Sequence, residues 1–110
     1  MSLVFFAALA LAQQVSQALT IAPGAIEEPC YPMQKTDRLE FSFSADQALD
    51  FNLHYHDDEG VSFPLNFKAV QHKEGVFIAP EPQTYCLMWT NKQAEPVKLE
   101  YQLRHYAAEG

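Results

Sequence analysis

The sequence predicts an all-β domain, an antiparallel sandwich or barrel, from two features. The first is the period of its apolar residues, which return at every second position over several runs after residue 37. Successive side chains of a strand point to opposite faces, so this period indicates strands with one buried and one solvated face. The second feature is a turn signal between the runs, roughly every 10–12 residues, which is typical of sandwiches and barrels.

Three runs show the alternation most clearly, and a fourth segment is apolar almost throughout. The continuous segment is TYCLMWT, which predicts a central strand buried on both faces. The alternating runs are residues 39–43, 49–55 and 97–103, and shorter strands are expected within 17–22, 63–70 and 76–78.

Breaks between these strands are predicted from polar and proline-containing segments. Pro80 and Pro82 exclude a regular strand there, because proline has no N–H to donate to a sheet. The remaining turns or loops are expected at residues 45–47, 57–60, 73–75 and 91–96.

The first residues are interpreted as a processing segment. Residues 3–12 (LVFFAALALA) are too short to span a bilayer, which takes about 20 residues, and resemble the apolar part of a secretory signal. Cleavage is expected after Ala12 or after Ala18. We therefore assign residues 1–18 to a signal-peptide remnant with vector-derived residues, 19–106 to one sandwich domain and 107–110 to a tail. The alternative for residues 3–12 is an ordinary buried helix.

The net charge of the sequence argues against nucleic acid as a partner. Fourteen Asp and Glu residues oppose seven Lys and Arg residues, for a net charge of −7. An acidic surface repels phosphate backbones, so we expect no nucleic-acid partner. After residue 18, no segment is long and apolar enough to predict a transmembrane helix.

The two cysteines, Cys30 and Cys86, lie 56 positions apart, which excludes a C-x-x-C redox or zinc motif. In an exported protein an even pair predicts a disulfide. The alternative is a pair of free buried thiols in a cytoplasmic protein.

The order of these segments resembles the GOLD (Golgi dynamics) domain of secretory-pathway cargo receptors, over residues 18–106. The matching segments are LTI, Cys30-Tyr31, LEFSFSA, LDFNLHYHDDEG, GVFIAP, TYCLMWTN and VKLEYQL. Only the cysteine pair, the aromatic strand around Cys86 and the following Asn91 are specific. The resemblance implies a jelly-roll-like β-sandwich of about seven or eight strands, a Cys30–Cys86 disulfide and a role in protein contacts. The receptors continue into a coiled coil, a membrane span and a cytosolic tail, which are not in these 110 residues, so cargo transport is not carried over.

One motif could hold a metal ion. His54 and His56 are two apart on a predicted strand, so their imidazoles share a face, next to Asp57 in an acidic turn. Asp50 and Asn52 lie on the same face. Imidazole and carboxylate ligands suit zinc or copper. The alternative is a solvated polar face.

Aromatic side chains could form a binding platform for a sugar or a peptide. The platform would consist of Trp89 with Tyr85, Phe41 and Phe51, and Tyr55 is a further candidate binding residue. The alternative is the sandwich core, and the sequence does not decide which face of the strand meets the other sheet. No nucleophile elbow, H-E-x-x-H helix or glycine-rich phosphate loop occurs in the sequence.

We therefore expect a non-enzymatic binding module in the periplasm or outside the cell. It would bind an unidentified protein, would need no cofactor and could form homo-oligomers. The alternative function is a periplasmic metal-binding protein that uses the His-x-His pair.

Overall fold

The computed structural model describes residues 13–108, and these form an all-β, antiparallel fold, as predicted. No helix in that range is long and apolar enough to cross a membrane. The seven strands are β1 (Gln13–Ile21), β2 (Ile26–Glu27), β3 (Cys30–Met33), β4 (Arg38–Asp57), β5 (Gly60–Ile78), β6 (Gln83–Thr90) and β7 (Val97–Tyr106).

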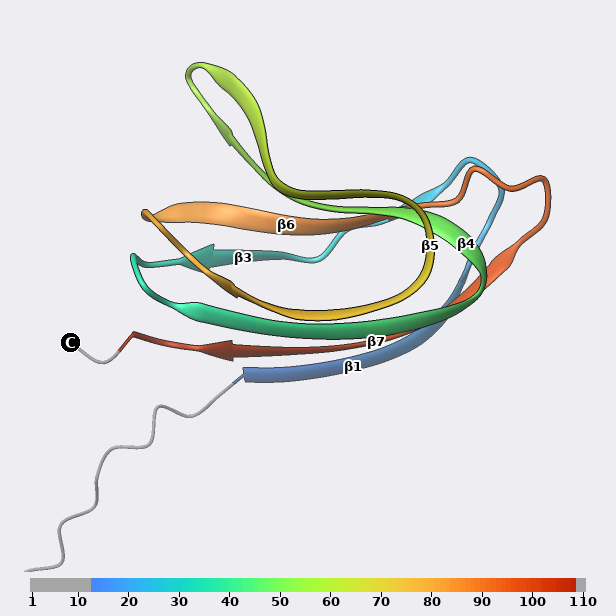
Figure 1. Cartoon of the computed structure of the whole chain (residues 1–110), viewed down its shortest axis with the longest axis horizontal. Coiled ribbons are helices and arrows are strands. Elements are labelled where there is room, and N and C mark those ends of the chain that lie inside the picture. Colours follow the sequence, from blue (N-terminus) through green and yellow to red (C-terminus); the bar gives the residue numbers. More distant parts are fainter. Residues whose placement is uncertain (1–12, 109–110) are drawn as a thin grey trace, which may run out of the picture.

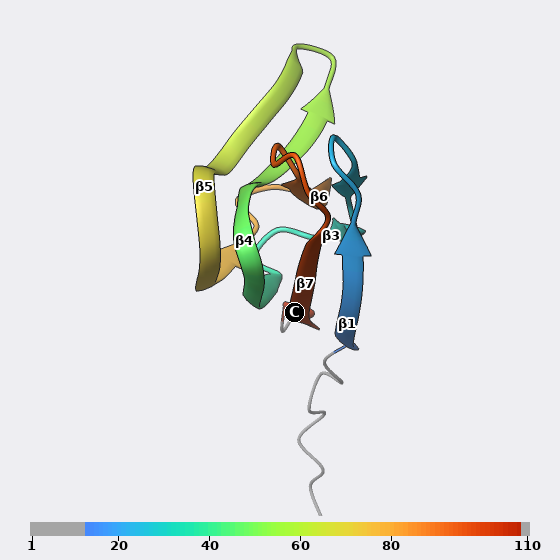
Figure 2. The same ribbon diagram turned by 90° about the vertical axis from the view of Figure 1, so that its right-hand side faces the viewer.

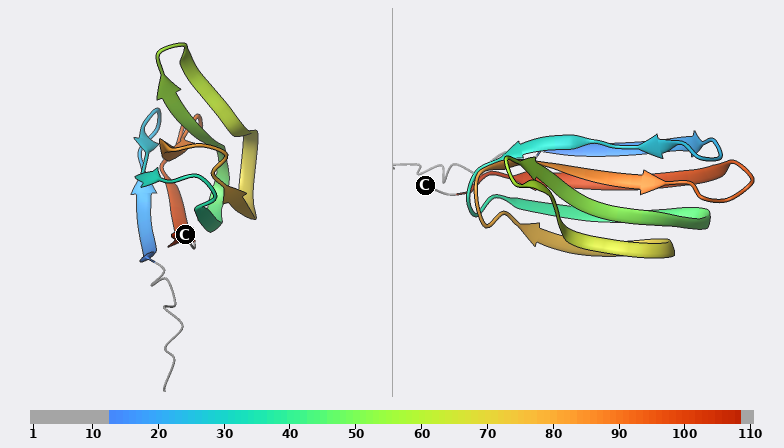
Figure 3. Two further views of the ribbon diagram at one scale, coloured as in Figure 1. Left: turned by 90° about the vertical axis from the view of Figure 1, so that its left-hand side faces the viewer. Right: turned by 90° about the horizontal axis from the view of Figure 1, so that it is seen from above.

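The long hairpin of β4 and β5 builds both layers of the sandwich (Figure 1). The first half of β4 pairs with β7, and β7 pairs with β1, which gives the first layer. The second half of β4 pairs with β6, whose other edge carries β2 and β3, and these strands give the second layer. The views at right angles show the two halves of the hairpin passing along both layers (Figures 2 and 3).

Two of the expected turns are absent from this hairpin. β4 continues through residues 45–47, where a register shift between Ser44 and Leu49 bends the strand without ending it. β5 continues through residues 73–75, so these turn predictions were wrong. Gly75 lies opposite Phe41, and a Cβ there would come within 2.8 Å of the Phe41 ring. The glycine makes room for an aromatic side chain inside a strand, a use that the sequence does not distinguish from a turn.

The strand β1 begins before the predicted domain boundary. Residues 13–18 pair with β7, from Gln13 opposite His105 to Ala18 opposite Glu100. The sheet therefore includes residues that were assigned to the signal-peptide remnant, and a cut after Ala18 would remove them. The rest of that assignment, residues 1–12, lies outside the described residues. In the predicted tail, the Ala108 amide donates a hydrogen bond to Asp37.

The core lies between the layers and is aromatic at its centre. The Trp89 ring on β6 stacks on Tyr101 of β7, with centroids 4.6 Å apart, and packs against Phe43 and Phe51 of β4. Along β7, Val97, Leu99, Tyr101 and Leu103 are buried and alternate with exposed residues, which confirms the predicted period.

Asn91 joins three segments at one end of the sandwich. Its amide nitrogen donates hydrogen bonds to the carbonyls of Ile21 and Glu95, both at 2.9 Å. Its amide oxygen accepts one from the Gln93 backbone. The side chain is fully buried, so its amide satisfies backbone groups that are shielded from water. The residue singled out in the GOLD resemblance therefore has a structural role in this chain.

Asp37 anchors the end of β7 to the turn before β4. Its carboxylate accepts hydrogen bonds from the backbone amides of Gln34 and Ala108 and contacts His105 Nε2 at 3.0 Å. Burial alone would raise the pKa of Asp37, but these donors and the charge of His105 together hold the pKa below 3.8.

We expect Asp37→Asn to lower the free energy of unfolding at pH 7 by about 1.5–3 kcal/mol, because the hydrogen bonds lose a charged acceptor. The depressed pKa stabilises the fold above pH 3.8, the unfolded-state value, and this stability is lost as the pH falls through the folded-state pKa. Urea titrations at several pH values should therefore show the gap between variant and wild type closing in acid. A gap that does not change with pH would contradict this account; the exposed Asp58→Asn is the control.

Candidate interaction site

The tip of the β4–β5 hairpin projects beyond the sandwich as an arm, defined as residues 55–64 (Figures 1 and 3). β6 pairs with β4 only as far as His54, so beyond that residue β4 pairs with β5 alone. Asp57 closes the tip by accepting a hydrogen bond from the Glu59 amide at 2.8 Å. Gly60 follows with φ of 123°, a conformation that favours glycine. The predicted acidic turn is confirmed.

The arm combines negative charge with exposed apolar groups. Asp57, Asp58 and Glu59 are exposed at the tip. Just behind them on β5, Val61 and Phe63 are 45% and 48% exposed. Adjacent exposed apolar side chains rimmed by charged groups can form a surface that contacts another molecule.

At the base of the arm His54 is nearly buried on the outer face of the second layer, with only 4% of its surface exposed. Its Nδ1 lies 2.7 Å from Asn52 Oδ1, and its Nε2 lies 3.1 Å from Glu28 Oε2. The rings of His56 and Phe63 pack against it, with centroids at 5.2 and 5.7 Å. Desolvation lowers the pKa of His54 by more than the charge of Glu28 raises it, and His56 lowers it further.

The predicted disulfide joins Cys30 of β3 to Cys86 of β6. The two cysteines face each other in register with their Cα atoms 4.0 Å apart, and the opposite neighbour of Cys86 is His54 on β4. The bond therefore fixes the short β3 strand to the sheet beside the base of the arm.

The structure brings two of the predicted metal ligands together, since the rings of His54 and His56 have centroids 5.2 Å apart. Asp57 is engaged in the turn, and His56 is exposed on the arm. Within residues 13–108, one group of ligand atoms lies within 4.8 Å of one another, from Glu28, His54 and Cys86. The Cys86 sulfur in that group belongs to the disulfide.

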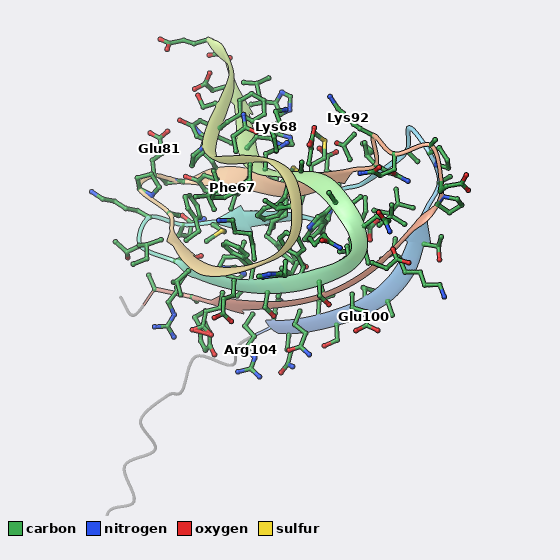
Figure 4. The ribbon with its side chains drawn as sticks, turned by 45° about the vertical axis from the view of Figure 1, so that its right-hand side comes forward. Phe67, Lys68, Glu81, Lys92, Glu100 and Arg104 are labelled. Carbon is green, nitrogen blue, oxygen red and sulfur yellow. A yellow bond between two sulfur atoms is a disulfide. The ribbon has the colours of Figure 1, made fainter. Side chains whose placement is uncertain are left out.

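The two other polar residues predicted on that face, Asp50 and Asn52, have different roles. Asp50 lies 3.6 and 3.5 Å from the ammonium groups of Lys68 and Lys92, two side chains labelled in Figure 4. Desolvation would raise the pKa of Asp50, but a hydrogen bond from the Ala69 amide and the two lysines lower it overall. Asn52 orients His54.

The predicted aromatic platform is wrong, because all four of its members are buried: Trp89, Tyr85, Phe41 and Phe51. Trp89 and Tyr85 have 0% exposure because their side chains point between the layers, toward the core. Tyr55 is half-buried and packs edge-on against Tyr85, with centroids 5.4 Å apart. These rings support the base of the arm from inside, and none of the five offers a free aromatic face of the kind predicted.

Two residues of this site were missed from the sequence. Glu28 comes from the irregular segment before β3, and only the pairing of β3 with β6 brings it to His54. Phe63 was assigned to a short strand without an exposed role. Its position on β5, opposite the HYHDD segment of β4, is the signal from which its exposed role could have been predicted.

The outer face of the first layer carries two shallow depressions of about 490 and 580 Å³. Small polar side chains line the first, including Ser16, Ser42 and Ser44. Glu100 and Arg104 point outward at this face (Figure 4). The exposed Val76 lines the second depression, and this face offers a comparison surface in binding experiments.

No protein-family model matches the chain, and no curated protein matches it in sequence. Two solved structures share its fold over almost the whole length. The Yersinia pseudotuberculosis-derived mitogen has a TM-score of 0.60 at 7% identity, covering 91% of this chain and 90% of its own. PliG of Aeromonas hydrophila, a periplasmic inhibitor of g-type lysozyme, has a TM-score of 0.55 at 12% identity, covering 93% and 92%. At such identities the likeness shows a shared fold alone, which in this chain is an antiparallel sandwich.

Proposed function

We propose that this protein is an exported, non-enzymatic binding module that binds another protein through the arm. The observation that carries the proposal is the joint exposure of Val61 and Phe63 beside the acidic tip. The Cys30–Cys86 disulfide supports a location in the periplasm or outside the cell, where such bonds persist. The fold shared with a periplasmic inhibitor and a mitogen is consistent with this class of function. The relation to the GOLD family, a domain of protein contacts, is part of the proposal.

The chemistry of the arm supports one kind of complementary surface on the partner. A narrow projecting hairpin fits a concave surface better than a flat one, and its acidic tip favours a positively charged one. Exposed charges chiefly accelerate association and set the specificity, whereas a buried aromatic anchor supplies most of the affinity. We therefore propose a basic cleft with an apolar pocket for Phe63 as the complementary surface.

Two variants of the arm test this proposal, each with a separate expected effect. Val61→Ser with Phe63→Ser is expected to weaken binding at least about 30-fold, the loss of about 2 kcal/mol that defines a hot spot. Asp58→Asn with Glu59→Gln is expected to slow association and to reduce its dependence on salt, with a smaller change in dissociation. Asp57 is retained in both because it closes the turn.

The matched control is Val76→Ser with Ile78→Ser, at the other end of β5. These side chains are 57% and 59% exposed, so the control removes as much exposed apolar surface as the arm variant. Partners would be isolated from the envelope fraction of the source organism, with a g-type lysozyme as a defined first probe, and measured by surface plasmon resonance. Equal loss in the control and the arm variant, or no loss in either, would contradict binding through the arm.

A further inference from the structure

We propose that reduction of the Cys30–Cys86 disulfide creates a zinc site on the outer face of the second layer. Its four ligands would be the two thiolates, the His54 imidazole and the Glu28 carboxylate. In the oxidised protein the sulfurs bond to each other, so neither is a thiolate that can bind a metal ion. The site would therefore take a borderline-soft divalent cation only when the thiols are free.

The sheet places three of these ligands in one row. His54 on β4 is opposite Cys86 on β6, and Cys86 is opposite Cys30 on β3. Antiparallel neighbours in register present their side chains to the same face, so all three project from one surface of the sheet. Glu28 reaches the same point from the segment just before β3.

The spacing of the ligand atoms suits a tetrahedral ion. The atoms of Glu28, His54 and Cys86 lie within 4.8 Å of one another, and His54 Nε2 is 3.1 Å from Glu28 Oε2. Ligands at about 2.0–2.3 Å from a tetrahedral zinc are separated by about 3.3–3.8 Å. Shifts of side chains alone can therefore bring these three atoms to a shared ion. Cys30 is proposed as the fourth ligand because reduction frees its thiol directly opposite Cys86.

The orientation of His54 is already that of a metal ligand. Metal-binding histidines donate their second ring N–H to a fixed acceptor, which holds the ring and its tautomer. Here Nδ1 lies 2.7 Å from Asn52 Oδ1, and both residues are buried, at 4% and 8% exposure. When Nδ1 carries the hydrogen, the Nε2 lone pair is directed at the Glu28 carboxylate. A cation held between these two acceptors satisfies both.

The chemical steps balance with a dithiol as the reductant. The dithiol gives two electrons and two protons to the sulfur–sulfur bond, forms its own disulfide and leaves two cysteine thiols. Zinc then displaces the two thiol protons to solvent as it binds the thiolates. Reoxidation returns the electrons to an oxidised dithiol and expels the ion.

The test uses the full chain in both redox states. One sample is reduced with a water-soluble trialkylphosphine, desalted without oxygen and titrated with zinc in competition with a chromophoric chelator; the other remains oxidised. The reduced protein is expected to bind one equivalent of zinc, and the oxidised protein none in the same range. Cobalt(II) in place of zinc should give the near-ultraviolet thiolate-to-metal band of a tetrahedral site. Zinc bound equally well by both states, or by neither, would overturn the proposal.

Variants separate this site from non-specific binding by thiols. Glu28→Gln and His54→Gln should each weaken zinc binding to the reduced protein more than about 10-fold, and Asn52→Ala by about 10–100-fold through the orientation of the ring. The matched control His72→Gln should leave it unchanged. Equal zinc affinity in the Glu28 and His54 variants and the wild type would assign binding to the thiols alone and overturn the four-ligand site.

Folding is followed in the same samples. Near-ultraviolet circular dichroism and the fluorescence of Trp89 report whether the reduced chain keeps its core. If reduction loosens the fold, zinc is expected to restore the signals of the oxidised protein in the wild type and not in Glu28→Gln or His54→Gln. A reduced chain that is unfolded and stays unfolded with zinc would overturn the proposal.

Discussion

Replacing Trp89 with alanine is expected to lower the free energy of unfolding by about 3–5 kcal/mol. Its ring has no exposed surface and contacts Phe43, Phe51 and Tyr101 from both layers. The substitution removes apolar contact area and leaves a cavity where the two layers meet. Surrounding strands can fill such a cavity only in part, because β4 and β7 are held by their own backbone pairing.

Urea denaturation followed by far-ultraviolet circular dichroism measures this effect, because the chain has one tryptophan and the variant loses its fluorescence. Trp89→Phe is the matched control. The indole Nε1 has no hydrogen-bond partner among the described residues, so phenylalanine gives up volume but no hydrogen bond within them. A cost below 1 kcal/mol for the alanine variant would place the ring at the surface and revive the binding platform.

The fold class could be predicted because the strongest sequence signal was also the physical cause of the fold. In β7 every second residue is buried against the other layer, so the period in the sequence is the period of the pleat. The central place of β6 was also predictable, since Tyr85, Cys86 and Leu87 are all buried.

The junctions within the long hairpin could not be predicted. Residues 45–47 and 73–75 have the composition of turns. Pairing with β4 keeps residues 73–75 extended, whereas residues 45–47 lie at a register shift through which β4 continues. Only the packing of Phe41 over Gly75 shows why a glycine stands there. Local propensity was overruled by tertiary contacts that the sequence does not display.

The candidate site was predicted only in part, again because contacts between distant segments decide the surroundings of each residue. His54 and His56 were correctly placed on one face of a strand, yet the structure gives them different surroundings. His54 is buried under Glu28, which approaches from an irregular segment that is distant in sequence, while His56 stays exposed on the arm. Burial of a polar side chain depends on what covers the face of the sheet, and no period in the sequence reports that.

The arm and its base have different roles, although their residues are adjacent in the structure. The tip and Phe63 face solvent and can contact a partner, whereas His54, Asn52 and the disulfide hold the base rigid. A binding loop on a rigid base loses less conformational entropy when it meets its partner. Loss of the disulfide should therefore affect stability and the order of the arm together.

Removing the disulfide in a Cys30→Ala, Cys86→Ala variant is expected to lower the free energy of unfolding by about 2–5 kcal/mol. The bond closes a loop spanning a sequence separation of 56, for which loss of chain entropy in the unfolded state predicts about 4 kcal/mol. It also holds β3, a strand of only four residues whose sole sheet neighbour is β6 in the described part of the chain. Residues 22–37 should then exchange amide hydrogens faster than β6 and β7, which hydrogen-exchange mass spectrometry can measure.

Chemical reduction of the wild type in the presence of a chelator should reproduce this loss, because the same bond is broken. When zinc is added in place of the chelator, the reduced wild type and the alanine variant should differ in their free energy of unfolding. Zinc can recover part of the stability of the reduced wild type but not of the variant, which lacks both thiolates. An unchanged melting temperature in the variant would show that backbone pairing alone fixes β3 to β6. A loss that zinc cannot reverse in the reduced wild type would leave the disulfide as a purely structural bond.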